Sequence, residues 1–277
     1  MGPVVVIGHD GLDYNLCHKM EMENMRDGEY YPYKSGYMET VRSWTSIYLG
    51  TNRHPFTGGW DNWLNHNYSD EPDLPYVWND INNRGYSIGV YGMPLTYPPF
   101  ELNGWVVSGF PCPGGKVPVY PSDLGLYINR HMTDIFDTVT SDGSFPRTVS
   151  RRHWYIYVEK GGSRLILEFL LNKMKNLKTI WNLMPVDVVF VGFSFVDHAL
   201  HLGHKNIQSL YKIADMSIGD VKSVLSPSKL LIVSDHGFEG ESHTPNAVLY
   251  VEGAHLDLGE QTRYEKDIKR DILSLLE

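Results

Sequence analysis

The chain has 277 residues and a formal net charge of −9, with 42% hydrophobic and 21% charged residues. This composition predicts a folded, soluble protein with a sizeable core, and it excludes an intrinsically disordered chain. The acidic balance argues against extended nucleic acid and against anionic membranes as partners, because both are bound through basic surfaces.

Cysteine content and the N-terminus indicate the compartment. Cys17 and Cys112 are the only cysteines, too few for a disulfide scaffold or a cysteine-rich zinc module. The N-terminus lacks the basic region and cleavage site of a signal peptide, and no apolar run approaches the roughly 20 residues that span a bilayer. We therefore expect a cytoplasmic protein, while the sequence carries no signal for its oligomeric state.

Apolar runs bounded by turn residues alternate with segments of helical period, which is the pattern of an α/β protein. Most of these runs are apolar throughout, as is typical of parallel strands buried on both faces. We expect a three-layer α/β/α sandwich with a mostly parallel central sheet. The predicted strands are Val4–Ile7, Ser87–Tyr91, Trp105–Ser108, Asp187–Phe193, Lys229–Val233 and Ala247–Val251.

Five segments have the period of an amphipathic helix, and the last one begins with a capping box formed by Thr262 and Glu265. Residues 95–154 are rich in proline, glycine and tyrosine, which predicts a small lid inserted into a single domain of residues 1–277. The predicted helices are Val41–Leu49, Leu74–Arg84, Ser163–Leu183, Ile207–Leu225 and Thr262–Leu276.

Carboxylate and imidazole side chains follow the ends of three predicted strands. Ligands of open α/β sheets bind outside the carboxyl ends of the strands, so we expect these side chains to meet in one crevice. Carboxylate oxygen and neutral imidazole suit zinc or a similar divalent ion. The candidate ligands are Asp10, Asp197, Asp235 and His236 after strands, His201 one helical turn beyond Asp197, and His243 before the last strand.

Six sequence segments resemble the alkaline phosphatase superfamily, and within it the type I phosphodiesterase and nucleotide pyrophosphatase branch with its prokaryotic phosphohydrolases. The resemblance extends from residue 4 to about residue 253, and its most specific parts are the DHG element and the upstream Asp-x-x-x-His. The segments are VVVIGHDGLD, ETVRSWTSIYLG, GMPLTYPPFELNGWVVSGFPCP, FSFVDHALH, VSDHGF and ESHTPNAVLYVEG.

The resemblance implies two divalent ions, and we expect Zn²⁺, with Mn²⁺ as the alternative. It assigns Asp197, His201 and His243 to one ion, and Asp10, Asp235 and His236 to the other. It also implies a threonine or serine nucleophile that lies between the ions and is itself a ligand.

In the family this nucleophile starts a helix and stands nine residues before a Thr-Gly pair. Leu49-Gly50 occupies that pair here, which points to Thr40. A hydroxyl at a helix N-terminus also faces free backbone N–H groups and the positive end of the helix dipole. Ser43 takes the position of a phosphate-binding asparagine of nucleotide pyrophosphatases, so the resemblance implies a contact with the substrate.

The predicted function is metal-dependent hydrolysis of a small phosphate ester, preferentially a phosphodiester or nucleotide, through a phosphothreonine intermediate. The alternatives within the superfamily are a phosphomonoesterase, a phosphonate hydrolase and a phosphomutase. A non-catalytic member that binds a phosphate ligand stays open as well, because the loop from Leu49 to Phe56 departs from the family pattern. A sulfatase is excluded, since no C-x-P-x-R segment is present.

Overall fold

The computed structural model describes residues 2–52, 75–110, 112–113, 117–129, 138–139, 163–201, 204–240, 242–257 and 262–277. Within this part of the chain, an eight-stranded sheet has the order β2-β12-β9-β1-β8-β3-β4-β6. The five strands from β9 to β4 are parallel to one another, while β12, β2 and β6 add antiparallel edges. The predicted mostly parallel sheet is confirmed.

The predicted strands are confirmed to within two residues at each end. They are β1 (Val4–His9), β3 (Ile88–Tyr91), β4 (Gly104–Val107), β8 (Val188–Phe193), β9 (Lys229–Val233) and β12 (Leu249–Glu252). The structure adds short strands that have no strong sequence pattern: β2 (Glu29–Tyr30), β5 (Cys112–Pro113), β6 (Val119–Tyr120), β7 (Thr138–Val139), β10 (Gly237–Glu239) and β11 (Ser242–Thr244).

The long predicted helices are also confirmed. They are α2 (Thr40–Leu49), α4 (Val77–Asn83), α6 (Ser163–Leu183), α8 (Ile207–Leu225) and α9 (Glu265–Ser274); the predicted start of the second, Leu74, lies outside the described residues. Further short helices are α1 (Tyr14–Lys19), η1 (Glu23–Met25), η3 (Ser122–Leu126) and α7 (Phe195–His201).

The predicted capping box at Thr262 and Glu265 is wrong. Helix α9 starts after Tyr264, whose backbone amide donates a hydrogen bond of 3.1 Å to the side chain of Asp267. Glu265 turns inward and is only 2% exposed, because it binds donors from another part of the chain.

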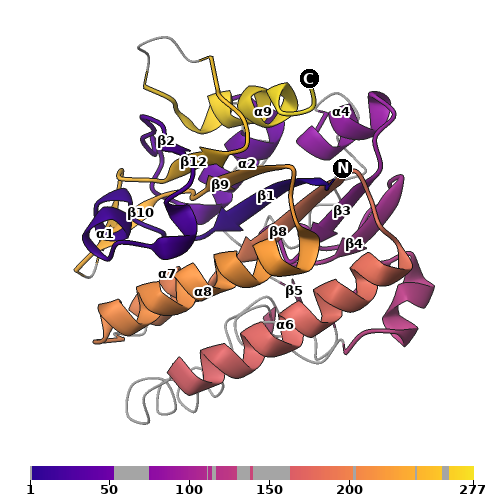
Figure 1. Cartoon of the computed structure of the whole chain (residues 1–277), viewed down its shortest axis with the longest axis horizontal. Coiled ribbons are helices and arrows are strands. Elements are labelled where there is room, and N and C mark those ends of the chain that lie inside the picture. Colours follow the sequence, from indigo (N-terminus) through magenta and orange to yellow (C-terminus); the bar gives the residue numbers. More distant parts are fainter. Residues whose placement is uncertain are drawn as a thin grey trace.

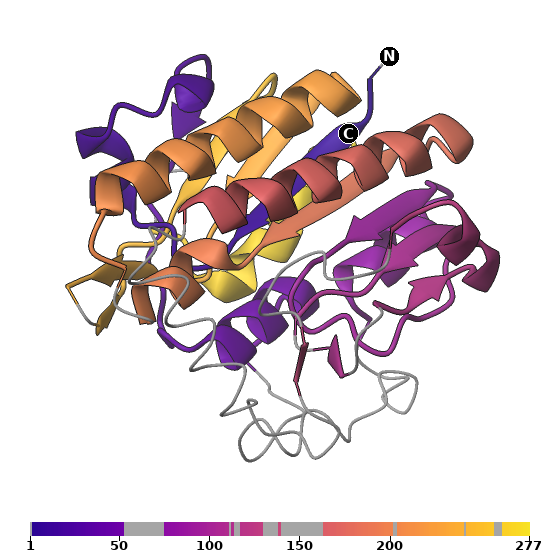
Figure 2. The same cartoon turned by 90° about the horizontal axis from the view of Figure 1, so that it is seen from below.

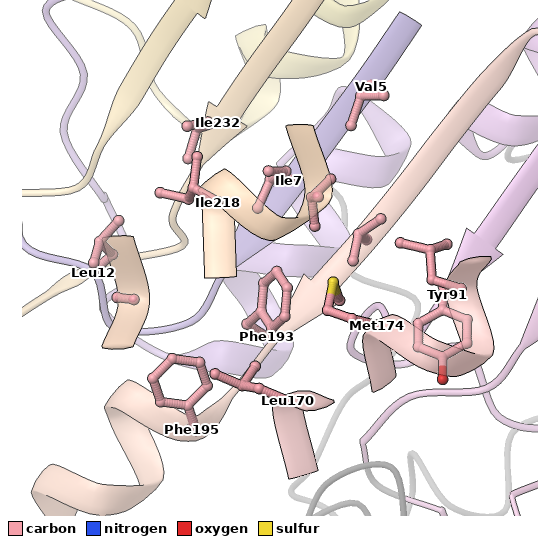
Figure 3. Close-up of a cluster of buried hydrophobic side chains, with 14 of the residues drawn as sticks. Val5, Ile7, Leu12, Tyr91, Leu170, Met174, Phe193, Phe195, Ile218 and Ile232 are labelled. Carbon is pink, nitrogen blue, oxygen red and sulfur yellow. The ribbon is translucent and has the colours of Figure 1, made fainter. Parts of the chain in front are cut away.

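Helices cover both faces of the sheet (Figures 1 and 2). Side chains of β1 alternate between the two faces: Val5 and Ile7 pack in the cluster that contains α6 and α8, and Val6 packs in the cluster that contains α2, α4 and α9. This alternation follows from the pleat of the strand. The three-layer α/β/α sandwich is thus confirmed, and Figure 3 shows side chains of the first cluster.

Helix α6 offers a matched test of this core. Leu170 packs in the first cluster (Figure 3). It is 5% exposed, whereas its neighbour Leu171 is 68% exposed. Leu170→Ala is expected to lower the free energy of unfolding by about 2–5 kcal/mol, because it removes buried methyl groups and leaves a cavity. Leu171→Ala should change it by no more than about 0.5 kcal/mol. Urea unfolding of both variants measures the difference, and equal losses would contradict this packing.

The topology brings three loops to one edge of the sheet. The strands β9, β1 and β8 are adjacent and parallel, so the loops that follow them leave from the same edge. Strand β12 is antiparallel to β9, so the β10–β11 hairpin that precedes it lies at this edge too. The predicted ligands therefore come from neighbouring loops.

Two parts of the predicted lid, β4 and β6, are strands of the central sheet. Residues 111, 114–116, 130–137 and 140–154 of this segment, as well as residues 53–56, lie outside the described residues. Among the helices that the structure describes, none combines the length and apolar character needed to cross a bilayer.

Candidate active site

The six predicted ligand side chains converge at the carboxyl edge of the sheet. One ligand atom from each of Asp10, Asp235 and His236 lies within 4.8 Å of the other two, and the same holds for Asp197, His236 and His243. His236 belongs to both groups, so the two groups form one continuous cluster. His201 joins the cluster through Asp197 and His243.

The Asp197 carboxylate is the centre of one half of the cluster. Its Oδ1 atom lies 3.1 Å from Nε2 of His243 and 3.3 Å from Nε2 of His201. These two Nε2 atoms are themselves 2.8 Å apart. Asp197 and His201 sit four residues apart on α7, as the spacing predicted, and one helical turn brings them together. Three ligand atoms thus face a common point.

His236 is the centre of the other half. Its Nε2 atom lies 3.3 Å from Oδ2 of Asp235 and 3.5 Å from Oδ1 of Asp10. It also lies 4.0 Å from Oδ1 of Asp197, which links the two halves. This nitrogen is enclosed, and no described residue gives it a hydrogen bond of good geometry.

Backbone carbonyls orient two of the imidazoles. Nδ1 of His243 lies 2.8 Å from the Met38 carbonyl, and Nδ1 of His236 lies 3.1 Å from the Gly237 carbonyl. A carbonyl only accepts hydrogen bonds, so we assign the proton of each ring to Nδ1. In the neutral ring, Nε2 then directs its lone pair into the cluster, as in histidines that bind metal ions.

Three carboxylates are buried together in this cluster: Asp10 and Asp235 are fully enclosed, and Asp197 is 4% exposed. Burial acts to raise the pKa of Asp197, but hydrogen bonds with His201 and His243 outweigh it and hold that pKa well below its usual range. Burial also raises the pKa of Asp235. Burial acts to lower the pKa of His243, but its bonds to Asp197 and the Met38 carbonyl outweigh it and raise that pKa.

Buried carboxylates need compensating positive charge, which divalent cations supply. The donor set of carboxylate oxygens and imidazole nitrogens fits zinc or manganese. The cluster is closed on the side of Asp10 and His236 and reaches solvent at His201, whose side chain is 49% exposed. A small ligand can therefore approach from the side of His201.

Neighbouring residues fix the loops that carry the ligands. Gly11 has a φ of +73°, and a Cβ there would lie 2.9 Å from Cβ of Asp197, so this position needs glycine. Asp13 caps α1 through Oδ1 and accepts a 2.8 Å bond from the Thr244 hydroxyl through Oδ2. This bond ties the hairpin of His243 to the loop after β1.

Thr40 is the first residue of α2 and is 8% exposed. The Met38 carbonyl that orients His243 lies two residues earlier, so the Cα of Thr40 is within about 8 Å of that of Met38. The N-cap residue Glu39 makes no capping bond through its side chain. The side chain of Glu39 thus does not cap the first backbone amides of α2. Backbone amides at a helix N-terminus can bind anions.

Ser43 is fully buried, and its hydroxyl donates a 3.3 Å hydrogen bond to Oε1 of Glu265. The structure therefore directs this hydroxyl to α9, and the predicted contact with substrate stays a prediction. Sequence patterns did not reveal the roles of Met38, Asp13 and Glu265, because each depends on a contact with a distant part of the chain.

Comparisons with known proteins show which family the chain matches. A model of the family "type I phosphodiesterase / nucleotide pyrophosphatase" matches residues 4–271. No curated protein has a matching sequence.

Solved structures share the fold at low sequence identity. The alkaline phosphatase of the Antarctic bacterium TAB5 is 12% identical, with 99% of this chain and 97% of that chain covered and a TM-score of 0.50. A protein of Bacteroides thetaiotaomicron described for the metabolism of multiple glycosaminoglycans is 12% identical, with 99% and 72% covered and a TM-score of 0.51. A murine ectonucleotide pyrophosphatase/phosphodiesterase is 13% identical, with 85% and 57% covered and a TM-score of 0.42.

The first two likenesses agree with the alkaline phosphatase type of fold that the resemblance implied. The family match extends over nearly the whole chain, and it includes every residue of the cluster as well as Thr40. The chain belongs to the type I phosphodiesterase/nucleotide pyrophosphatase family of ester-bond hydrolases.

Proposed function

We propose that this protein hydrolyses small phosphate esters, preferentially phosphodiesters or nucleotides, with two divalent ions and Thr40 as the nucleophile. The observation that carries the proposal is the cluster of three buried carboxylates and three imidazoles, in which His243 is bonded to the Met38 carbonyl, two residues before Thr40 at the start of α2. Family membership supports phosphoester hydrolysis, and the cluster supports the metal dependence.

Asp197, His201 and His243 would hold one ion, and Asp10, Asp235 and His236 the other, with Thr40 as an additional ligand. The distances within each set support this division, although His236 also lies 4.0 Å from Asp197. When bound, zinc or manganese ions would neutralise charge on the phosphoryl oxygens and lower the pKa of a nearby hydroxyl. Two such ions would also offset part of the −9 charge of the chain for an anionic substrate.

Thr40 would form a bond from Oγ to phosphorus while the bond from phosphorus to the leaving oxygen breaks. The Thr40 hydroxyl loses its proton as this bond forms, and the departing oxygen takes up a proton, so that the group leaves as an alcohol or, for a nucleotide, as phosphate or pyrophosphate. Water then attacks the phosphorylated Thr40, which frees its hydroxyl and releases phosphate or a monoester. The first amides of α2 would bind a phosphoryl oxygen while charge develops on it.

The net charge of −9 supports a small-molecule ester over extended nucleic acid. Cys17 and Cys112 are both buried thiols, which supports the expected reducing, cytoplasmic setting. A phosphomonoesterase, a phosphonate hydrolase or a phosphomutase remains the alternative for the same cluster and nucleophile.

A substrate panel with a metal control tests the proposal. Chelator-treated protein, reconstituted with Zn²⁺ or Mn²⁺, is incubated with chromogenic diesters, nucleotides, monoesters and phosphonates. We expect turnover of at least one diester or nucleotide that disappears with chelator and returns with the ion. Metal binding without turnover of any ester would instead support a non-catalytic phosphate-binding protein.

A further inference from the structure

Glu265 is a buried carboxylate that accepts hydrogen bonds from residues on both sides of Thr40. Its Oε1 atom lies 2.9 Å from the Ser35 hydroxyl and 2.8 Å and 3.2 Å from the backbone amides of Gly36 and Tyr37. The Ser43 hydroxyl, in the first turn of α2, lies 3.3 Å from the same atom. Hydrogen bonds to an ionised acceptor are among the stronger ones in proteins.

These donors belong to the turn that leads into α2 and to the helix itself. Ser35 also stabilises the turn, because its hydroxyl oxygen accepts a 3.0 Å bond from the Met38 amide. The carbonyl of Met38 in turn orients His243. One oxygen of Glu265 thus fixes the segment before Thr40 and the helical turn after it.

Other residues of α9 hold this helix in the fold. Ile268 and Ile272 are fully buried in the same cluster as Ile47 of α2. Lys269 pairs with Asp80 at 2.7 Å and packs against Gly50, at the opposite end of α2. These residues hold α9 against other parts of the fold, whereas the hydrogen bonds of Glu265 are made at the end of α2 where Thr40 lies.

We propose that Glu265 is a positioning residue, which sets the place of the Thr40 hydroxyl by fixing the Ser35–Met38 turn and the start of α2. This inference rests on the proposed function, because it assigns Glu265 an effect on the nucleophile. Misplacing a reacting group by about 1 Å can cost on the order of 100-fold in rate. Glu265 should therefore affect kcat much more than KM.

The test compares Glu265→Ala and Glu265→Gln with a control, Asp267→Asn. Asp267 lies in the same first helical turn and also accepts a backbone amide, but that amide belongs to Tyr264 and not to the turn before Thr40. With metal-loaded protein and a chromogenic diester, we expect kcat to fall about 100-fold in Glu265→Ala and about 10-fold in Glu265→Gln. KM and the number of bound ions should change little, and Asp267→Asn should match the wild type.

Amide hydrogen exchange of residues 35–43, measured without substrate, gives a second readout. It should be faster in Glu265→Ala than in Asp267→Asn, and intermediate in Glu265→Gln, which also serves if the alanine variant does not fold. An unchanged kcat in both Glu265 variants, or an equal loss in Asp267→Asn, would overturn the positioning role. If the wild type hydrolyses no ester at all, the proposed function fails. The exchange measurement is independent of that result: amide exchange of residues 35–43 that is unchanged in both Glu265 variants would show that Glu265 does not fix this segment.

Discussion

Replacing Thr40 by Ala is expected to lower kcat by at least about 1,000-fold, because no other hydroxyl at the start of α2 can form the covalent intermediate. Ser43 is bound to Glu265 inside the protein, and Thr45 and Ser46 are buried further along the helix. Thr40→Ser retains a hydroxyl at the same position, so we expect it to keep measurable activity. Steady-state rates of metal-loaded wild type, Thr40→Ala and Thr40→Ser on one diester give the comparison.

Mass spectrometry of protein quenched during turnover provides the control for this prediction. The wild type should carry the phosphoryl group of the substrate on the peptide that contains Thr40, and Thr40→Ala should carry none. Full metal-dependent turnover by Thr40→Ala would show that the nucleophile is elsewhere.

Replacing His236 by Ala should have an effect of similar size through a different cause. His236 is fully buried, and its Nε2 lies within 4.0 Å of carboxylate oxygens of Asp10, Asp197 and Asp235. Because it is assigned to one ion and also lies within 4.8 Å of ligand atoms of Asp197 and His243 at the other, its loss should weaken binding of both ions and lower activity by at least about 1,000-fold. Inductively coupled plasma mass spectrometry of the purified protein counts the ions that remain.

His255→Ala is the matched control. His255 is 72% exposed, and its Nδ1 lies 3.0 Å from Glu29, outside the cluster. This variant should bind ions and hydrolyse esters as the wild type does. If His236→Ala kept both its ions and its activity, the cluster would not be the metal centre.

Much of the fold could be predicted from local sequence patterns. Val188–Phe193 and Lys229–Val233 are apolar on both faces, and this pattern identifies buried parallel strands without knowledge of their neighbours. Helices α6 and α8 were predicted with their observed bounds, because each keeps one apolar stripe over several turns. Short strands such as β2 and β10 could not be predicted, because they form by pairing with another strand and their own residues show no strand pattern.

The convergence of the candidate ligands was expected for a similar reason. Asp10, Asp197 and Asp235 each follow a strong strand, and parallel strands place such loops at one edge of the sheet. The adjacency of β9, β1 and β8 made these loops immediate neighbours, and this order could not be inferred from the residues alone.

The supporting contacts were not predictable, because they join residues far apart in the chain. Glu265 was expected to cap its own helix, yet its carboxylate accepts hydrogen bonds from Ser35 and Ser43. The spacing between Thr262 and Glu265 fits the capping-box pattern, but burial of Glu265 beside several hydrogen-bond donors favoured the distant contact. The backbone carbonyl of Met38 likewise orients His243, and the identity of the Met38 side chain gives no indication of this contact.

The measurement that tests the central claim most directly is a metal titration of chelator-treated protein, with bound ions and the rate of bis(4-nitrophenyl) phosphate hydrolysis recorded in the same samples. The account predicts that the rate is near zero without ions, rises with ion content and reaches its plateau at two ions per chain. A rate that is independent of ion content, or no hydrolysis of any phosphate ester at two bound ions per chain, would contradict it.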